Sequence, residues 1–509
     1  MKNSRAIVIG GGFGGLALAI RLKSQGFKTL LLEKRDKLGG RAYVFEDGGF
    51  KFDAGPTVIT APHCLEELFQ MARRKMQDYI ELKPVFPFYR LSWQDGYTFD
   101  YSNDNDALKR QILQKSPADW QGYLKFLDYS KRVFDEGYTK LVHVPFLDFW
   151  SMVRCAPQLA RLQAFRSVYS MVSQYIQDPQ LREAFSFHSL LIGGSPFSSS
   201  SIYTLIHHLE RNWGVFFPMG GTGALVKALG RLFVEIGGEV RTDAEVGQIL
   251  TSSDKVTGVR LKDGRTFPAD IVACNSDVAH AYRDLLGHEP AVKRARKKAL
   301  GSSYSMSLFV LYFGTNKKYP GRAQHEVLFG PRYKGLLDDI FKKGRLADDF
   351  SLYLHTPTVT DPSLAPDGHE GFYVLSPVPH LGKANLDWTS VGPMYADRIL
   401  SHLDQHALPG LKQSLVTRRI FTPLDFKTEL NSHLGSAFSV EPVLTQSAYF
   451  RTHNRDPDLK GLYFVGAGTH PGAGVPGVVN SAKATAMVIE NDFRPEITVP
   501  VFSKDLLPI

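Results

Sequence analysis

Residues 6–15 read AIVIGGGFGG, and this stretch decides the fold. Its first four residues have the apolar character of a short buried strand, and the apolar residues after the glycines repeat at helical spacing. Between them, Gly10, Gly12 and Gly15 form the pattern G-x-G-x-x-G. Glycine at these places permits a tight turn, close approach of a pyrophosphate and close helix–strand packing. A second strand at 29–32 completes a β-α-β unit, so we predict a Rossmann-like dinucleotide-binding domain.

Two features at the end of the second strand narrow the choice of dinucleotide, and only the second of them separates FAD from NAD. Glu33 ends that strand, where a carboxylate accepts hydrogen bonds from ribose hydroxyls and repels the 2′-phosphate of NADP. Gly39-Gly40-Arg41 then resembles an extension found in the flavoprotein amine oxidase and carotenoid desaturase superfamily. In that superfamily the arginine lies against the FAD pyrophosphate, which suits its charge and its fork of donors. We therefore predict FAD as the cofactor.

Two further glycine-containing motifs occur at 53–57 and 461–475. The first reads DAGPT, and in the same superfamily its Gly-Pro step brings the backbone close to the isoalloxazine ring. The second reads GLYFVGAGTHPGAGV, which predicts a strand, a glycine-rich turn and the start of a helix near 476–477. A flat ligand can lie against such bare backbone, and the positive helix end suits the electron-rich edge of a reduced flavin. His470 within this turn is more typical of a structural or cofactor-lining residue than of a base.

The string at 461–475 resembles the signature of the bacterial and fungal phytoene desaturases. The likeness extends from Ala6 to about Ile489 and includes FSFHSLL at 185–191 and GSAFSVEP at 435–442. It implies FAD-dependent desaturation of an apolar C40 polyene towards neurosporene or lycopene. Each step would transfer a hydride to flavin N5 with loss of a neighbouring proton, and oxygen or a quinone would be the electron acceptor. The sequence leaves the number of steps open.

The predicted cofactor-binding residues follow from these motifs and that resemblance. They are Gly10, Gly12, Phe13, Gly14, Gly15, Glu33, Lys34, Gly40, Arg41, Gly55, Pro56, Thr57, Val246, Gly466, Gly468, Thr469, Gly474 and Val475. The flavin itself carries the redox chemistry, and no metal site is predicted because no metal-ligand motif is present. Arg154, His188 and Glu441 are candidates for polarising the substrate or accepting its proton, and a water molecule is the alternative acceptor.

The bulk composition excludes several other classes. The chain has 509 residues, 43% of them hydrophobic, which is typical of a globular protein with two or three domains. A net charge of +9 comes from scattered basic clusters without a groove-reading motif, so we expect no nucleic-acid partner. Three widely spaced cysteines favour a reducing, cytoplasmic setting without disulfides. The apolar N-terminus is explained by the dinucleotide motif, and no other run is long enough to span a membrane.

The order of the motifs predicts an α/β fold of the two-dinucleotide-binding type with interleaved domains. We assign residues 1–75, 217–285 and 455–491 to a discontinuous FAD-binding domain, and 76–106 and 286–454 to an α+β substrate-binding domain. Residues 107–216 are predicted to form a helical, membrane-facing subdomain, and 492–509 a disordered tail. The basis for membrane contact is the segment from Phe146 to Tyr175, where aromatic and arginine residues alternate along a helical pattern. Such a segment suits peripheral association with an anionic membrane surface, although an ordinary packed helix is the competing interpretation.

Two other function classes share parts of this pattern. A related carotenoid desaturase or a carotenoid cis–trans isomerase would use the same FAD motifs, and only its products would differ. A flavin-free, prenyl-binding chaperone of the same fold is a remote alternative, because the fingerprints at both ends of this chain are intact.

Overall fold

The computed structural model describes residues 4–493 and is built around a parallel sheet of five strands. The strand order is β19-β13-β1-β2-β9, with Ile7 of the central strand opposite both Leu30 and Val272. The strands come from three separate stretches of chain: β1 (Arg5–Ile9), β2 (Lys28–Leu32), β9 (Glu239–Arg241), β13 (Ile271–Cys274) and β19 (Leu462–Phe464). This parallel sheet and the glycine turn after β1 confirm the Rossmann-like fold class.

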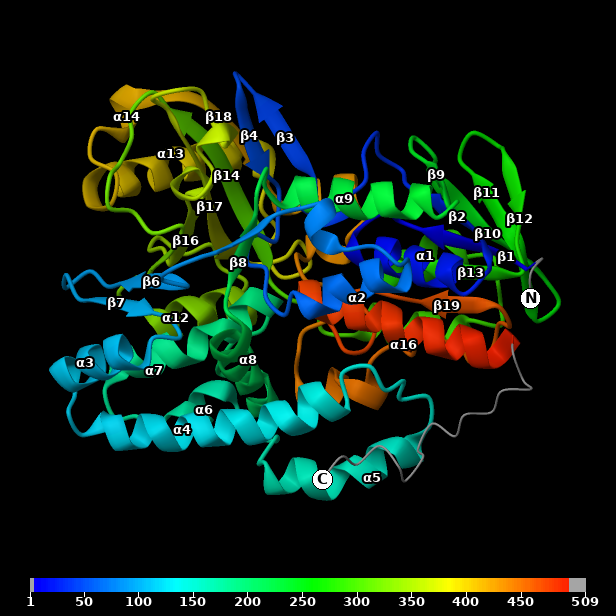
Figure 1. The fold of residues 1–509 in the computed structure, drawn as a ribbon, viewed down its shortest axis with the longest axis horizontal. Helices are drawn as coiled ribbons and strands as arrows, with labels where there is room; N and C mark the ends of the chain where they lie inside the picture. The colour runs from blue at the N-terminus through cyan, green and yellow to red at the C-terminus, as the bar shows by residue number, and fades with distance from the viewer. Residues whose placement is uncertain (1–3, 494–509) are drawn as a thin grey trace.

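Three helices pack together beside this sheet (Figure 1). They are α1 (Phe13–Ser24), α9 (Thr222–Glu235) and α16 (Val475–Phe493), and α2 (His63–Met71) contacts both α1 and α16. The helix α1 is buried along nearly its whole length, which explains why its sequence is apolar all round rather than amphipathic. A small antiparallel sheet of β10 (Val246–Ser252), β11 (Lys255–Leu261) and β12 (Thr266–Pro268) extends this half of the molecule.

A mixed sheet of seven strands forms the second half, in the order β18-β14-β17-β16-β15-β6-β7. Its long central strands, β14 (Ser307–Thr315) and β17 (Glu370–Val378), are almost entirely buried, because helices cover one face and the cavity described below lies on the other. The remaining strands are β6 (Tyr89–Ser92), β7 (Thr98–Tyr101), β15 (His325–Leu328), β16 (Leu352–His355) and β18 (Leu415–Phe421). Two short ribbons pair β3 (Val44–Asp47) with β4 (Phe50–Asp53), and β5 (Leu82–Pro84) with β8 (Phe216–Pro218).

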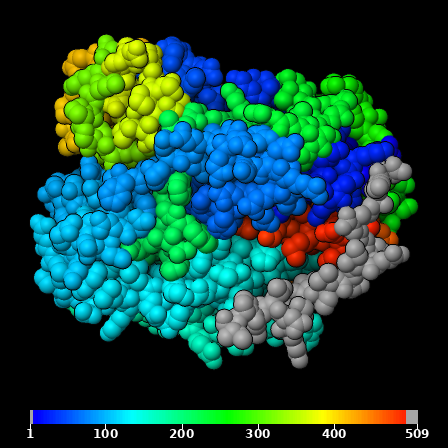
Figure 2. Space-filling model, in the orientation of Figure 1, coloured from blue at the N-terminus to red at the C-terminus, as the bar shows by residue number. Residues whose placement is uncertain are grey.

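A layer of helices lies below the second sheet in Figure 1. It consists of α3 (Asn105–Lys115), α4 (Asp119–Phe134), α5 (Phe149–Arg161), α6 (Val168–Val172), α7 (Pro179–Ser186) and α8 (Leu205–Trp213). Figure 2 shows this cyan layer forming one continuous flank of the molecule. The other helices are α10 (Val278–His280), α11 (Lys293–Gly301), α12 (Tyr333–Asp338), α13 (Trp388–His406), α14 (Leu411–Ser414) and α15 (Pro423–Leu430).

The structure agrees with the main predicted elements and moves one boundary. The helix α16 begins at Val475, next to the predicted 476–477, and continues through Phe493, where the sequence placed the start of a disordered tail. Asp492 accepts hydrogen bonds from Tyr463 (2.7 Å) and Arg455 (2.6 Å), which fixes this end of the helix on β19. The rest of the predicted tail lies outside the described residues. Within residues 4–493, no helix is long and apolar enough to cross a membrane.

Candidate functional site

One cavity of about 590 Å³ joins the glycine turns of the first sheet to the buried face of the second. Most of the predicted cofactor residues line it: Gly10, Gly12, Phe13, Gly14, Glu33, Lys34, Gly40, Arg41, Gly55, Pro56, Thr57, Val246, Gly474 and Val475. Its other walls are largely apolar and come from β14, β15, β16, β17, the helical layer and the segments beside them, with Phe187, Met306, Leu308, Val310, Phe329 and Phe438 as examples. A dinucleotide site and an apolar chamber therefore share one space.

The turn before α1 leaves a positive helix end facing this cavity. Gly12 occupies the N-cap position without a side-chain cap, and the first turn of α1 contains no acidic residue. The N–H groups there are therefore available to an anion. Gly15 does not line the cavity; a Cβ on it would lie 2.0 Å from the carbonyl oxygen of Gly10, so this glycine allows helix and strand to pack closely.

Glu33 is buried at the end of β2, beside the same turn. Its Oε2 accepts a hydrogen bond from the backbone N–H of Gly11 at 2.7 Å, and its Oε1 accepts one from Arg35 at 3.0 Å. Each carboxylate oxygen can accept a second hydrogen bond, so Glu33 is held in place with acceptor capacity remaining. That arrangement suits the ribose hydroxyls of a dinucleotide. Lys34 follows it and donates to Thr428 O and to Asn431 Oδ1, both at 2.9 Å.

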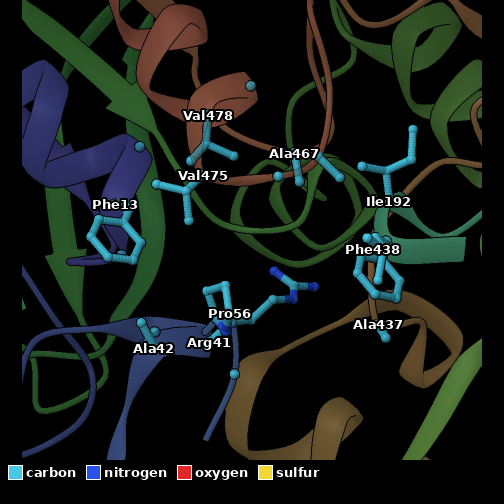
Figure 3. Close-up of a pocket in the computed structure, with 18 of the residues that line it drawn as sticks. Phe13, Arg41, Ala42, Pro56, Ile192, Ala437, Phe438, Ala467, Val475 and Val478 are labelled. Carbon is cyan, nitrogen blue, oxygen red and sulfur yellow. The ribbon is translucent and has the colours of Figure 1, made fainter. Parts of the chain in front are cut away.

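Arg41 extends into the cavity beside Pro56, opposite Val475 and Val478 of α16 (Figure 3). Its Nη2 donates to Ser432 Oγ at 2.6 Å, whereas its Nε is buried without a hydrogen-bond partner. Burial lowers the pKa of Arg41 from its ordinary value, and the carboxylate of Asp277 opposes that shift. A guanidinium with a buried, unsatisfied donor fits a ligand that carries negative charge, such as a pyrophosphate.

The DAGPT motif packs directly on the Arg41 segment. A Cβ on Gly55 would lie 2.0 Å from the carbonyl oxygen of Arg41, so only glycine fits. The turn is fixed by the hydroxyl of Tyr312, which donates to Ala54 O at 2.8 Å. Thr57 Oγ1 lies 2.9 Å from the Tyr373 hydroxyl and 3.2 Å from that of Tyr353. The backbone of this turn is therefore a rigid wall of the cavity.

The C-terminal turn closes the site from the other end of the chain. Gly466, with φ of 102°, lies against Gly14, since a Cβ on Gly14 would come within 3.2 Å of the Gly466 Cα. Gly466, Gly468 and Thr469 stand behind the cavity wall, while Gly474 and Val475 line it. His470 lines it too, but its Nε2 is 2.9 Å from the carbonyl oxygen of Leu141, and burial lowers its pKa to about 4. These contacts agree with a structural role for His470.

The three catalytic candidates lie at different distances from the cavity. Arg154 is exposed on α5 and does not line the cavity, and Glu441 is buried behind the wall, where Ser198 Oγ donates to it at 3.2 Å. Burial raises the pKa of Glu441. His188 is buried one residue beyond the lining residue Phe187, with its Nε2 3.2 Å from Glu210 Oε2. The structure therefore brings none of the three into the cavity wall itself.

Several polar residues that line the cavity were missed by sequence reasoning, among them Glu210, Asn275 and Asp277. Asn275 Nδ2 donates to Gly10 O at 3.2 Å and so braces the fingerprint turn. Asp277 follows β13, and its negative charge favours the charged form of the Arg41 guanidinium. The signal for these two was their place directly after a strand of a parallel sheet, which is where ligands of such sheets bind. Glu210 lies on α8, where no local signal marks it.

Comparison with known proteins defines the class. The family model for flavin containing amine oxidoreductases matches residues 13–489, so this chain belongs to that family. A solved oxidoreductase from Methanosarcina mazei has the same fold, with a TM-score of 0.63 at 17% identity, covering 96% of this chain and 100% of that one. Membership of this family indicates FAD as the cofactor. The uncapped start of α1 and the unsatisfied donor of Arg41 fit the pyrophosphate of that cofactor.

Within that family the chain groups with the phytoene desaturases. It is 60% identical over 485 residues to a protein named phytoene desaturase (lycopene-forming) from Pantoea ananas, covering 95% of this chain and 99% of that one. It is 41% identical over 497 residues to phytoene desaturase (neurosporene-forming) from Rhodobacter capsulatus, covering 97% and 95%. The predicted resemblance is thus confirmed over nearly the whole chain.

Proposed function

We propose that this protein desaturates phytoene, an apolar C40 polyene, in several FAD-dependent steps and forms lycopene. The observation that carries this proposal is the single cavity in which the dinucleotide turns continue into an apolar chamber. The likeness to the lycopene-forming relative is greater than to the neurosporene-forming one, which favours lycopene as the end product.

The residues described above divide the work of holding the cofactor. The N–H groups at the start of α1 and the guanidinium of Arg41 would bind the pyrophosphate, and Glu33 would bind the ribose. The rigid turn at 55–57 and the start of α16 would hold the flavin ring. When bound, FAD supplies the acceptor for a hydride from carbon.

The substrate has no charge for the protein to grip, so shape and the exclusion of water must align it. The walls formed by β14, β15, β16 and the helical layer present side chains such as Met306, Leu308, Val310 and Phe329. Moving a CH₂ group of the substrate from water onto such an apolar surface is favourable by about 0.8 kcal/mol, and each such group along the polyene adds to the binding free energy. The same walls keep water from the reacting carbon atoms.

The substrate reaches the cavity through the α5 segment at a membrane surface. Met152, Cys155 and Leu159 on one face of α5 line the cavity, while Phe149, Trp150 and Phe165 on or just after this helix expose 52%, 69% and 68% of their surfaces. Exposed aromatic side chains on a helix that also carries arginine suit the interface of an anionic bilayer. The helix thus connects the bilayer, where a C40 hydrocarbon dissolves, with the cavity.

Vesicle flotation tests this membrane contact. With anionic phospholipid vesicles, W150S/F165S is expected to float at least tenfold less than the unchanged protein, because two aromatic anchors are removed. The matched control is M394S, since Met394 is 60% exposed on α13, away from α5 (Figure 1). Equal flotation of all three proteins would refute the contact at α5.

Conversion assays test the desaturation and identify the acceptor. The FAD-loaded protein is incubated with phytoene in anionic liposomes, under air or with a quinone under argon, and the pigments are separated. Formation of lycopene in either condition supports the proposal and distinguishes oxygen from quinone. A single rearranged isomer without added double bonds would instead favour a carotenoid isomerase.

We also propose that the chain divides into three domains with separate roles. Residues 1–75, 217–285 and 455–491 bind FAD, 76–106 and 286–454 bind the polyene, and 107–216 contact the membrane. The support is that the strands of the parallel sheet come from the first set, whereas those of the seven-stranded sheet come from the second.

A further inference from the structure

Glu210 is a buried carboxyl group in the wall of the largely apolar chamber. It is only 1% exposed and lines the cavity from α8, next to Leu209 and Ile206. Its Oε1 accepts a hydrogen bond from the Tyr89 hydroxyl at 2.7 Å. Its Oε2 is buried without a hydrogen-bond partner. A carboxyl group left half-satisfied in such a place costs free energy, and native proteins keep such groups mainly where function needs them.

His188 stands directly behind this carboxyl group. Its Nε2 lies 3.2 Å from Glu210 Oε2, yet neither of its ring nitrogens has an aligned hydrogen bond. Tyr89 also contacts the edge of the His188 ring, with ring centroids 6.0 Å apart. The imidazole is therefore close enough to orient Glu210 and to respond to its charge, but the carboxyl group is the member of the pair that reaches the cavity.

A chain of buried polar and aromatic side chains runs from this pair to the turn expected at the flavin ring. The Tyr89 ring lies 6.0 Å from that of His325, whose Nδ1 is 2.6 Å from the Tyr353 hydroxyl. Tyr353 in turn contacts Thr57 in the DAGPT motif at 3.2 Å. All of these side chains are buried. Glu210 is therefore connected to the predicted flavin-facing turn through successive buried contacts.

From this geometry we propose that the carboxylate of Glu210 accepts the proton that each desaturation step removes, and that His188 positions it. This inference rests on the proposed function. One C–H bond of the polyene breaks and its hydrogen leaves with both electrons, as a hydride, to the bound FAD. The neighbouring C–H bond then gives its proton to Glu210 Oε2, and its electron pair becomes the new C=C bond. The polyene thus loses one hydride and one proton. The bound FAD would take up the hydride with its two electrons and pass the electrons to the acceptor, and Glu210 would hold the proton.

The same negative charge would assist the hydride transfer. Loss of a hydride leaves the carbon atom electron-poor, and a carboxylate in a water-free cavity stabilises positive charge far better than one in water. Arg154 and Glu441 are less suited to this role, because neither lines the cavity. Water is less suited because the surrounding wall is largely apolar. A single carboxyl group thus performs two tasks at one place.

Anaerobic single-turnover experiments with E210Q test the proposal. Mixed with phytoene in liposomes without an acceptor, E210Q is expected to bleach its flavin at least 100-fold more slowly than the unchanged protein, which is the scale of general-base catalysis. Its FAD content is expected to be unchanged, as is the spectral shift on adding lycopene, which reports binding alone. The matched control is E183Q. Glu183 is a half-buried carboxyl group that does not line the cavity, and it accepts a hydrogen bond of 2.6 Å from Trp93 Nε1.

A second readout follows the proton itself and needs no variant. Infrared difference spectra of protein labelled with ¹³C-glutamate, taken before and after flavin reduction by phytoene, are expected to show the carbonyl band of a newly protonated carboxyl group. Absence of that band would overturn the proposal, and this holds even if E210Q fails to load FAD.

The outcomes separate this inference from the function on which it depends. If the unchanged protein neither bleaches nor forms pigment, the proposed function fails. If it does both and E210Q bleaches within threefold of it, only the role of Glu210 fails. If E210Q loses the lycopene-induced shift together with bleaching, Glu210 serves binding, and its assignment as proton acceptor is wrong.

Discussion

The substitution G55A tests the packing between the Gly-Pro turn and the Arg41 segment. The added Cβ would lie 2.0 Å from the carbonyl oxygen of Arg41, whereas ordinary contact begins near 3.4 Å, so one backbone segment must move by about 1.4 Å. Neither segment is free to move. Ala54 N donates to Tyr43 O at 2.8 Å, and the Tyr312 hydroxyl holds Ala54 O. The strain therefore falls on the two segments that carry Arg41 and Pro56.

The free-energy cost expected for G55A is that of adding a methyl group to a site that is already fully packed. Inserting a methyl group into a packed site costs about 1–3 kcal/mol, which corresponds to a loss of FAD affinity of roughly 5- to 150-fold if the bound state requires the original geometry. Titration of the FAD-free protein with FAD, followed by flavin fluorescence, measures this affinity. Thermal unfolding of the FAD-free protein is expected to show a lower Tm as well, because the clash exists without the cofactor.

The control for this prediction is G301A. Gly301 ends α11, and a Cβ on it would meet no atom within 4 Å. This variant is expected to match the unchanged protein in both assays. If G55A bound FAD with unchanged affinity and kept its Tm, the close contact between the two segments would be refuted.

Three further predictions concern the cofactor site and its pH dependence. In G12A the Cβ would come no closer than 3.3 Å to any neighbour, so we expect FAD affinity to fall at least tenfold while the Tm of the FAD-free protein stays nearly the same; equal losses in both would contradict the role of Gly12 in ligand approach. In R41K the fork of donors is lost while the charge remains, and FAD affinity is expected to fall about tenfold or more; R231K, on the exposed face of α9, is the control. Burial raises the pKa of Asp53 to about 6 from 3.8, so the folded state binds its proton more tightly than the unfolded chain. The stability of the unchanged protein relative to D53N should therefore fall by roughly 2 kcal/mol between pH 4.5 and pH 7, and a pH-independent difference in chemical unfolding would refute this.

The parts of the site that depend on local backbone geometry could be predicted from sequence. Gly10, Gly12 and Gly15 specify a turn whose conformation follows from the residues themselves, and the structure places Gly10 and Gly12 between β1 and α1 and Gly15 in the first turn of α1. Arg41 was found because its motif lies next to the second strand. The predicted role of Gly15 is also visible in the structure, as the approach of its neighbours leaves no room for a Cβ.

The parts that depend on packing between distant segments could not be predicted in this way. Glu210 lies in LIHHLERNW, which reads as an ordinary amphipathic helix, and its burial results from Tyr89 on a strand about 120 residues earlier. Asn275 and Asp277 reach the cavity beside the glycine turn only because β13 pairs with β1 in the folded sheet. Arg154 is a residue that the sequence suggested for the site and the structure does not place there. It lies on α5 with its side chain exposed at the surface.

The central claim is that bound FAD receives hydrogen from a polyene in this cavity. It is tested most directly by mixing the FAD-loaded protein with phytoene in anionic liposomes under argon, without any acceptor, while flavin absorbance and polyene products are measured together. The account predicts that the oxidised flavin band bleaches and that one C=C bond is formed for each flavin reduced. Flavin that stays oxidised while phytoene is unchanged, or is only isomerised, would contradict it.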